Sequence, residues 1–388
     1  MTSTIDPSSS PSGRQDSVAL RRVPPEVTPP LHREMGKSGA RSGAEDVAGD
    51  VVEAHAPAGP RTPRYLRVVI TTRCPMQCPF CHHEGLKPSS EDAGSRVGRD
   101  GSPSFEEWCC MLEAAVEAGV RKLKFLGGEP LVYRDLPRLI ARVKRVAPGV
   151  DVSMITSGAA QPSALAACFE AGLDRANLSI HGWTERTFAR NGSKALFELR
   201  RRNLKRLLER GRPVKLNYVY TGASCEADLA AFLDDVRRPP IAGRGVVVSI
   251  LDDLSNPGMG PDTIRSLLRR LCGTLPAAEV DDDPYSLPAE RYRWPSGLCV
   301  EVKSSRLGDL APWNACGTCD KRAQCREGTF ALRLDPTGRV RFCMDRLDLG
   351  FSLIEPARAG RDQGAKAWRR AVAGAVRPGF GQEQVFSA

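Results

Sequence analysis

Three cysteines lie within eight residues of the chain, Cys74, Cys78 and Cys81 in the stretch TTRCPMQCPFCHHEG. Thiolates clustered in this way bind zinc or an iron–sulfur cluster. A structural zinc site takes four ligands in two pairs, and this loop offers no nearby partner for a fourth. A [4Fe–4S] cluster has one ligand position per iron. Three cysteines on one loop would therefore leave one iron open to another molecule.

A second group of cysteines lies toward the C-terminus. CGTCDKRAQC contains Cys316, Cys319 and Cys325, LRLDPTGRVRFC ends at Cys343, and Cys299 lies upstream. Spacings of two and five residues are typical of metal ligands, and both a zinc ribbon and a second iron–sulfur cluster agree with them. The remaining cysteines are isolated, and we expect them to pack as small apolar residues: Cys109, Cys110, Cys168, Cys225 and Cys272.

Short β-rich runs alternate with helical patterns about six times between these two groups. The runs cover residues 65–71, 122–127, 150–156, 175–180, 214–220 and 245–251. Such alternation predicts parallel βα units, too few for a closed eight-stranded barrel, so we expect an α/β fold with a partial barrel. Barrel chemistry lies on the loops at the carboxyl ends of strands. The three-cysteine loop directly follows the first run.

The composition divides the chain into four sections. Residues 1–62 are rich in Ser, Pro, Gly and charge without apolar periodicity, and we expect them to be disordered because burial cannot offset the entropy of ordering them. Residues 63–255 form the expected barrel. Residues 256–345 form a second, cysteine-bearing domain. Residues 346–388 are expected to be a helix followed by a loose tail.

Charge and hydropathy exclude several classes of protein. The N-terminus has no apolar core of the kind a signal peptide needs, and no run is long enough to span a bilayer. We therefore expect a cytoplasmic protein without a membrane partner, in which clustered cysteines are metal ligands. The net charge is +10, but only 6% of the residues are aromatic, which argues against nucleic-acid binding. The charge is explained most simply by solvated helix faces such as RRRNLKR at residues 200–206, and attraction of a phosphorylated substrate is the alternative explanation.

The spacing C-x3-C-x2-C after a first strand resembles the signature of the radical S-adenosylmethionine (SAM) superfamily. The resemblance implies a partial (β/α)6 barrel of the TIM type, in which Cys74, Cys78 and Cys81 hold a [4Fe–4S] cluster and SAM chelates the open iron. It implies that one electron, from a donor such as flavodoxin or ferredoxin, splits SAM and releases a 5′-deoxyadenosyl radical that abstracts hydrogen from a substrate. The cofactor would supply this chemistry while the protein positions and shields it.

A second motif, FLGGEPL at residues 125–131, is similar to the Gly-Gly-Glu that binds the SAM amino group in the superfamily. The resemblance assigns that role to Gly127, Gly128 and Glu129, where two glycines would let the backbone approach a ligand closely. It also implies that Phe80 packs beside the adenine. Three residues that follow expected strands are candidates for binding the SAM ribose or carboxylate: Thr156, Ser157 and Ser179.

Within the superfamily, residues 64 to about 350 most resemble the GTP 3′,8-cyclases of molybdenum-cofactor synthesis. The segments that carry the resemblance are YLRVVITTRCPMQCPFCHHEG, GVRKLKFLGGEPLVYRDLPRLI, LSIHGWTERTF, VKLNYVYTG and LRLDPTGRVRFC. That family binds its second cluster with three cysteines and ends in Gly-Gly, whereas this chain has at least four candidates and ends in QVFSA. The C-x2-C-x5-C spacing instead resembles the SPASM or twitch domains. We therefore expect an auxiliary [4Fe–4S] domain, with Cys316, Cys319, Cys325, Cys343 or Cys299 as ligands.

Three hypotheses follow for the function. The first is a radical SAM enzyme that cyclises or rearranges a small molecule, such as a nucleoside, sugar or amino-acid derivative, in a specialised pathway. The GTP 3′,8-cyclase activity itself is an alternative to it. The second is a peptide-modifying enzyme, against which residues 1–62 offer no folded peptide-docking domain. The third is a zinc-binding scaffold without SAM affinity.

Residues that could act on the substrate are identified by position alone. His181 follows the fourth run and is a candidate base for a radical intermediate that must lose a proton, or else makes a structural hydrogen bond. The other candidates could face the barrel mouth or form surface ion pairs: Arg67, Arg134, Asn217, Arg333 and Arg341.

Overall fold

The computed structural model describes residues 64–86, 103–241, 244–252, 260–281, 289–303, 316, 319–320, 325 and 331–375. The predicted disorder of residues 1–62 falls outside these ranges. Residues 54–388 belong to one compact unit. Within its described residues, no helix has the length and apolar character needed to cross a bilayer.

One sheet organises the described residues, with strands in the order β12-β11-β10-β1-β2-β3-β4-β5-β6-β9-β8-β7. All six expected strands are present and pair in parallel: β1 (Tyr65–Thr71), β2 (Lys122–Gly127), β3 (Asp151–Thr156), β4 (Arg175–Ile180), β5 (Val214–Tyr220) and β6 (Val247–Asp252). The α/β fold and its parallel βα units are thereby confirmed.

Two further parallel strands extend the sheet, one at each end of the run from β1 to β6. Strand β10 (Leu332–Leu334) pairs with β1, and β9 (Cys299–Lys303) pairs with β6. Antiparallel strands then complete both edges: β11 (Arg339–Arg341), β12 (Gly350–Ser352), β8 (Ala289–Arg293) and β7 (Glu279–Asp281). Strands from beyond residue 256 therefore flank the predicted barrel on both sides.

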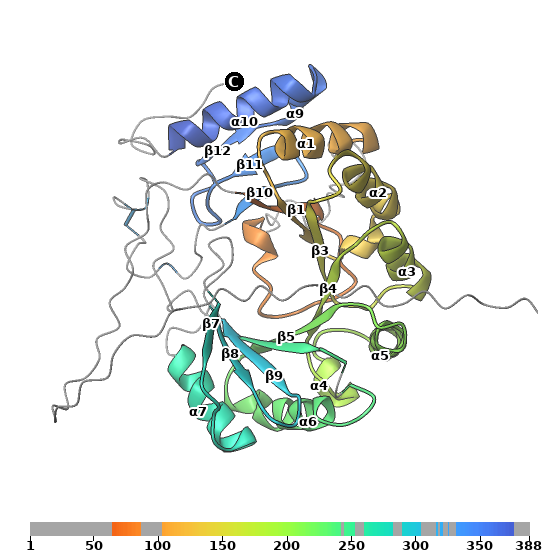
Figure 1. Ribbon diagram of the computed structural model, residues 1–388, viewed down its shortest axis with the longest axis vertical. Helices are drawn as coiled ribbons and strands as arrows, with labels where there is room; N and C mark the ends of the chain where they lie inside the picture. The colour runs from red at the N-terminus through yellow and green to blue at the C-terminus, as the bar shows by residue number, and fades with distance from the viewer. Residues whose placement is uncertain are drawn as a thin grey trace, which may run out of the picture. The chain divides into compact units, whose positions relative to one another are not determined.

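Helices follow the strands and cover the outer side of the sheet (Figure 1). They are α1 (Phe105–Glu117), α2 (Leu136–Val146), α3 (Pro162–Glu170), α4 (Glu185–Phe188), α5 (Lys194–Glu209), α6 (Glu226–Val236) and α7 (Pro261–Cys272). Ser104 begins α1 with a capping box, since its side chain accepts from Glu107 N while the Glu107 carboxylate accepts from Ser104 N. The described residues also include short 3₁₀ turns: η1 (His83–Gly85), η2 (Pro130–Val132) and η3 (Ala223–Cys225).

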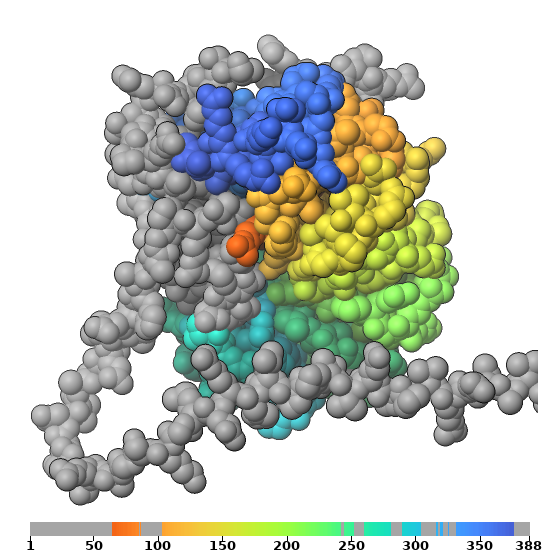
Figure 2. Space-filling model, turned by 45° about the horizontal axis from the view of Figure 1, so that its top comes forward, coloured from red at the N-terminus to blue at the C-terminus, as the bar shows by residue number. Residues whose placement is uncertain are grey.

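The C-terminal helices α9 (Ile354–Arg358) and α10 (Arg361–Ala375) pack on α1. Figure 2 shows α10 and α1 side by side on the surface. A Cβ atom built on Gly364 of α10 would lie 2.6 Å from the Ala114 Cβ, so only glycine permits this approach. Cys109 and Cys168 are fully buried, and Cys110, Cys225 and Cys272 pack against the same core, which confirms the predicted packing of the isolated cysteines.

Candidate active site

The three-cysteine loop leaves the carboxyl end of β1 and is held by backbone hydrogen bonds from two sides. Gly128 N donates to Thr71 O (2.7 Å) and Glu129 N donates to Arg73 O (2.9 Å). On the other side, Gln77 N donates to Asn191 O (2.8 Å). The loop that carries the cysteines is therefore fixed by β2 and by the segment between α4 and α5.

The three thiols lie close enough to influence one another. Burial, followed by the neighbouring Cys81 and Cys74 thiols, raises the pKa of Cys78 to about 12. Cys74 and Cys81 are exposed and Cys78 is half-buried. Among the described residues, no group of three or more His, Cys, Asp or Glu could share a single metal ion. A [4Fe–4S] cluster does not require such a group, because each thiolate binds a different iron, so the donor set fits a cluster at this loop.

The two glycines of the Gly-Gly-Glu segment make room for the cysteine loop itself. A Cβ atom on Gly127 would lie 2.2 Å from Thr71 O, and one on Gly128 would lie 2.2 Å from Arg73 O. Gly127 also has a φ of +143°, which favours glycine. The two glycines were expected to let the backbone approach a ligand closely. In the structure they let it approach the loop backbone that presents Cys74. SAM binding by these glycines stays a prediction.

Glu129, Thr156 and Ser157, named separately from the sequence, form one buried cluster. The Glu129 carboxylate accepts from Thr156 Oγ1 (2.6 Å) and Leu131 N (3.1 Å) on one oxygen, and from Ser157 N (2.8 Å) and Ser157 Oγ (2.6 Å) on the other. Burial raises the pKa of Glu129, and these hydrogen bonds oppose the shift. Thr156 and Ser157 therefore orient the carboxylate. An incoming ammonium group would share or replace these donors.

Phe80 and His181 meet across a cavity of about 270 Å³ at the carboxyl ends of β4 and β5. Their ring centroids are 5.1 Å apart. Burial and the nearby Arg200 lower the pKa of His181 to about 4, so the imidazole is neutral near pH 7 and is a weak base. Its Nδ1 finds no hydrogen-bond partner among the described residues. The two rings give the cavity an aromatic wall, which fits a flat heterocycle such as adenine.

Asp228 of α6, which the sequence analysis did not single out, stabilises the same cavity. Its buried carboxylate accepts from Trp183 N (2.7 Å), Thr184 N (3.1 Å) and Tyr218 Oη (3.1 Å). It thereby ties the loop after β4 to β5. Ser179 lies half-buried on β4 opposite Asn217 of β5, one residue beyond Leu178, which pairs with Thr156.

Glu84, also missed from the sequence, connects the cysteine loop to the C-terminal strands. Its carboxylate accepts from Arg67 (2.5 Å) and from Arg333 Nε (3.2 Å), and its carbonyl accepts from Arg341 (2.9 Å). His83 and Glu84 both have positive φ values, 51° and 53°, which are uncommon for residues other than glycine. Arg67, Arg333 and Arg341, three of the five proposed substrate groups, thus meet at one buried residue, two of them at its carboxylate and one at its backbone carbonyl.

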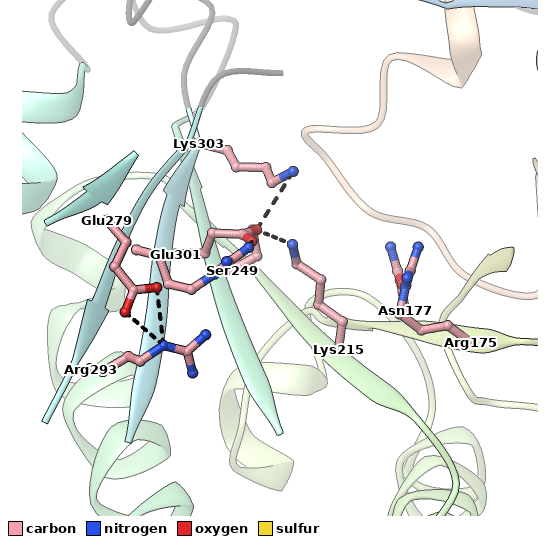
Figure 3. A network of polar contacts seen from close by, with 9 residues as sticks. Arg175, Asn177, Lys215, Ser249, Glu279, Arg293, Glu301 and Lys303 are labelled. Atoms are coloured by element: carbon pink, nitrogen blue, oxygen red, sulfur yellow. Dashed lines mark hydrogen bonds and ion pairs between the residues drawn. The ribbon is translucent and has the colours of Figure 1, made fainter. Parts of the chain in front are cut away.

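A second cavity of about 380 Å³ lies inside the curve of the sheet. Seven cationic side chains of the described residues line it, together with a single carboxylate, Glu301: Arg67, Lys122, Lys124, Arg175, Lys215, Arg291 and Lys303. Asn217, expected at the barrel mouth, also lines it. In Figure 3, Lys215 and Lys303 point toward Glu301, and Arg175 and Asn177 lie across from them on β4. The sequence contains a signal for this cavity, because lysines in KLKFLG, and a lysine and an asparagine in VKLNYVY, occupy alternate positions of otherwise apolar strands.

The C-terminal cysteines lie largely among residues outside the described ranges. Cys343 follows β11 and is half-buried, Cys299 is buried on β9, and Cys319 N donates to Cys316 O (3.4 Å). Cys325 is exposed. The auxiliary ligand set and the domain boundaries at 255 and 345 stay predictions. Arg134 is not among the residues that line either cavity.

Comparison with known proteins connects this geometry to a family. A model described as the radical SAM superfamily matches residues 68–236. A protein of Methanopyrus kandleri named "Probable GTP 3',8-cyclase" is 29% identical over 276 residues, covering 70% of this chain and 81% of that protein. The "GTP 3',8-cyclase" of Aliarcobacter butzleri is 25% identical over 271 residues, covering 68% and 78%.

Among solved structures, SuiB of Streptococcus suis bound to S-adenosylmethionine superposes with a TM-score of 0.52 at 16% identity. The match covers 76% of this chain and 64% of that one, so the chain spans less than two thirds of SuiB. The likeness supports the same fold. A partial TIM-type barrel agrees with it and with the sheet described above.

Proposed function

Since this chain is a radical SAM enzyme, with its radical SAM domain at residues 68–236, we propose that it acts on a small phosphorylated substrate, of the nucleotide class, bound inside its barrel. Its cofactors are a [4Fe–4S] cluster and SAM. When bound, they would supply a carbon radical able to abstract hydrogen from the substrate. The proposal assigns Cys74, Cys78 and Cys81 to the cluster, Glu129 to the SAM amino group and Phe80 to its adenine.

The observation that carries the proposal is the charge of the inner cavity. Gathering like charges in a buried space is costly, and among the described residues seven cationic side chains and one carboxylate line this cavity. Burial and the neighbouring cations Arg67 and Lys303 lower the pKa of Lys124, and burial and Lys303 lower that of Lys215 to about 7. A phosphorylated occupant would relieve this repulsion. The volume of about 380 Å³ also suits a small molecule.

The position of Arg67 supports a substrate in this cavity. Arg67 lines the cavity, and its guanidinium also pairs with Glu84, three residues beyond Cys81. One side chain therefore contacts both the substrate cavity and the segment that continues the cysteine loop. An anion held by Arg67 would therefore contact a side chain that also anchors the segment after the cysteine loop.

The names of the relatives make GTP the first compound to test. Among the small-molecule classes named from the sequence, the charge of the cavity favours nucleotides and sugar phosphates over uncharged sugars and amino acids. It gives no support to a peptide substrate. The zinc scaffold is set aside, because the chain is an enzyme of an iron–sulfur family.

The test is anaerobic reconstitution with iron and sulfide, followed by measurement of 5′-deoxyadenosine under dithionite. We expect GTP or another phosphorylated compound in a panel to accelerate its formation, and the matching nucleoside or free sugar to have no effect. Transfer of deuterium from a labelled substrate into 5′-deoxyadenosine would identify the reacting carbon. Equal acceleration by the unphosphorylated compounds would refute a phosphorylated substrate while leaving the SAM chemistry intact.

A further inference from the structure

The segment that runs from α4 into α5 packs against the cysteine loop. Asn191 O accepts from Gln77 N (2.8 Å). Met76 of the loop belongs to a small buried apolar cluster, and Cys78 packs against that cluster. The other buried members of the cluster come from α4, from α5 and from the loop after β3: Phe188, Phe197 and Ala159. The cysteine loop and these two helices therefore share one small core.

The exposed surface of the same segment is strongly basic. Residues 185–202 carry five exposed cations but only two exposed carboxylates, Glu185 and Glu198. Positive charge is not spread evenly over the helices, since α1 and α6 each contain four carboxylates and no Lys or Arg. We call the five exposed cations the α4–α5 basic face: Arg186, Arg190, Lys194, Arg201 and Arg202.

The stability of the fold does not account for these cations. On α2, three of the four cations pair with carboxylates. By contrast, the side chains of Arg186, Arg190 and Arg202 have no hydrogen-bond or ion-pair partner in the part of the chain that the structure describes. Lys194 forms an exposed pair with Glu185 (3.2 Å), which contributes little, and it lies in the first turn of α5, where the helix dipole disfavours a cation. The basic face is therefore available to a partner.

We propose that the α4–α5 basic face is the docking surface for a small acidic protein that carries one electron, of the flavodoxin class. Cleavage of SAM consumes one electron, which neither SAM nor the substrate supplies. The electron passes from the anionic hydroquinone of the partner's flavin, which becomes the neutral semiquinone, to the cluster at the cysteine loop, and no proton moves. The inference rests on the proposed function, because it assumes that Cys74, Cys78 and Cys81 hold that cluster.

Charge complementarity and location together favour this partner. Opposite charges steer two proteins into contact and fix their orientation. Because α4 and α5 share a core with the cysteine loop, a protein docked there would be positioned close to the cluster. A nucleic acid fits less well, since both aromatic residues of the segment, Phe188 and Phe197, are buried and cannot stack on bases.

The experiment is calorimetric titration of the full chain with oxidised flavodoxin at low salt. The test variant combines Arg186→Gln, Lys194→Gln and Arg201→Gln. It leaves Arg190 unchanged, because that residue also lines the cavity beside Phe80. We expect the variant to bind flavodoxin on the order of tenfold more weakly and to keep the native melting temperature. Binding to the native protein should also weaken as the salt concentration rises.

The matched control removes three positive charges from other helices. It combines Arg145→Gln at the end of α2, Arg269→Gln on α7 and Lys366→Gln on α10, all of which are exposed. We expect its affinity for flavodoxin to change by about twofold at most. In the reconstituted enzyme, the test variant should form 5′-deoxyadenosine more slowly than native with limiting flavodoxin hydroquinone, and at the native rate with dithionite.

The outcomes separate the docking surface from the proposed substrate. Equal weakening in test and control variants, binding that does not depend on salt, or no binding to the native protein would each overturn the docking surface and leave the proposed function standing. A single-stranded RNA that displaces flavodoxin from the native protein, but binds the test variant weakly, would assign the face to nucleic acid and overturn it. Equal acceleration by unphosphorylated compounds would refute the proposed substrate and leave the docking surface standing.

Discussion

Replacing Lys215 by methionine tests whether the charged cavity binds anions, because the lysine should take up a proton when an anion binds. The Lys215 side chain is 13% exposed, and its pKa is about 7 because burial and Lys303 outweigh the attraction of Glu301. At pH 8 only about one tenth of the lysine is protonated. A bound anion would restore its pKa toward the ordinary value, so binding should take up about 0.9 proton at this site.

The direction of the pH dependence follows from the linkage between proton binding and anion binding. The complex binds more protons than the free protein between the two pKa values, so affinity should fall as pH rises above about 7, by up to tenfold, or about 1.4 kcal/mol, per pH unit. Below pH 6 the lysine is already charged, and the uptake should approach zero. The Lys215→Met variant should lose this pH dependence together with part of its affinity.

The assay is calorimetry with sulfate, which does not titrate in this range, in two buffers of different ionisation enthalpy. Lys124, whose pKa is also lowered, contributes proton uptake in both proteins. The readout is therefore the difference in proton uptake between native and Lys215→Met. We expect this difference to be close to one at pH 8 and close to zero at pH 6. Lys205→Met, on the exposed face of α5, is the control and should behave as the native protein. Equal uptake by native and Lys215→Met at pH 8 would refute the reasoning.

Three further predictions concern the cysteine loop. Glu84→Gln should lower the free energy of unfolding by about 3 kcal/mol at pH 7, because it leaves buried arginines without their carboxylate. The pKa of Glu84 is lowered on folding, so its ionised form stabilises the folded state. Chemical denaturation should therefore show the stability difference between native and Glu84→Gln shrinking as pH falls below about 4.3. Gly128→Ala should destabilise the protein by about 3 kcal/mol in the same assay, since its Cβ would lie 2.2 Å from a loop carbonyl, and unchanged stability would contradict the geometry. A variant with Cys74, Cys78 and Cys81 all changed to alanine should fall from about eight to about four irons per chain and form no 5′-deoxyadenosine; iron content equal to the native value would remove the cluster from this loop.

The six central strands were predictable because each is a short apolar run bounded by turn residues. The cysteine loop was predictable because its spacing alone limits the chemistry. Strands β9 and β10 were not predicted, since CVEVK and LRL are short and lie where the alternation with helices has stopped. Their partners, β6 and β1, are distant in sequence, and no local pattern indicates them.

The charged cavity was missed for a different reason. Lys124 and Lys215 were visible in the sequence, but the direction of a side chain on a buried parallel strand depends on the curvature of the whole sheet. The role of Glu84 was not predicted, because its left-handed backbone conformation is usually indicated by a glycine and this position is a glutamate. The sequence therefore identified the residues near the expected cofactor better than those around the charged cavity.

The pairing of β10 with β1 also has a consequence for the order in which the protein matures. Glu84 and Arg333 are separated by 249 positions, so the ribosome releases the cysteine loop long before it makes the strand that anchors it. Until β10 docks, the backbone that presents Cys74, Cys78 and Cys81 lacks one side of its support. We expect iron–sulfur insertion at this loop to follow the synthesis of β10, which would make cofactor loading a late, post-translational step.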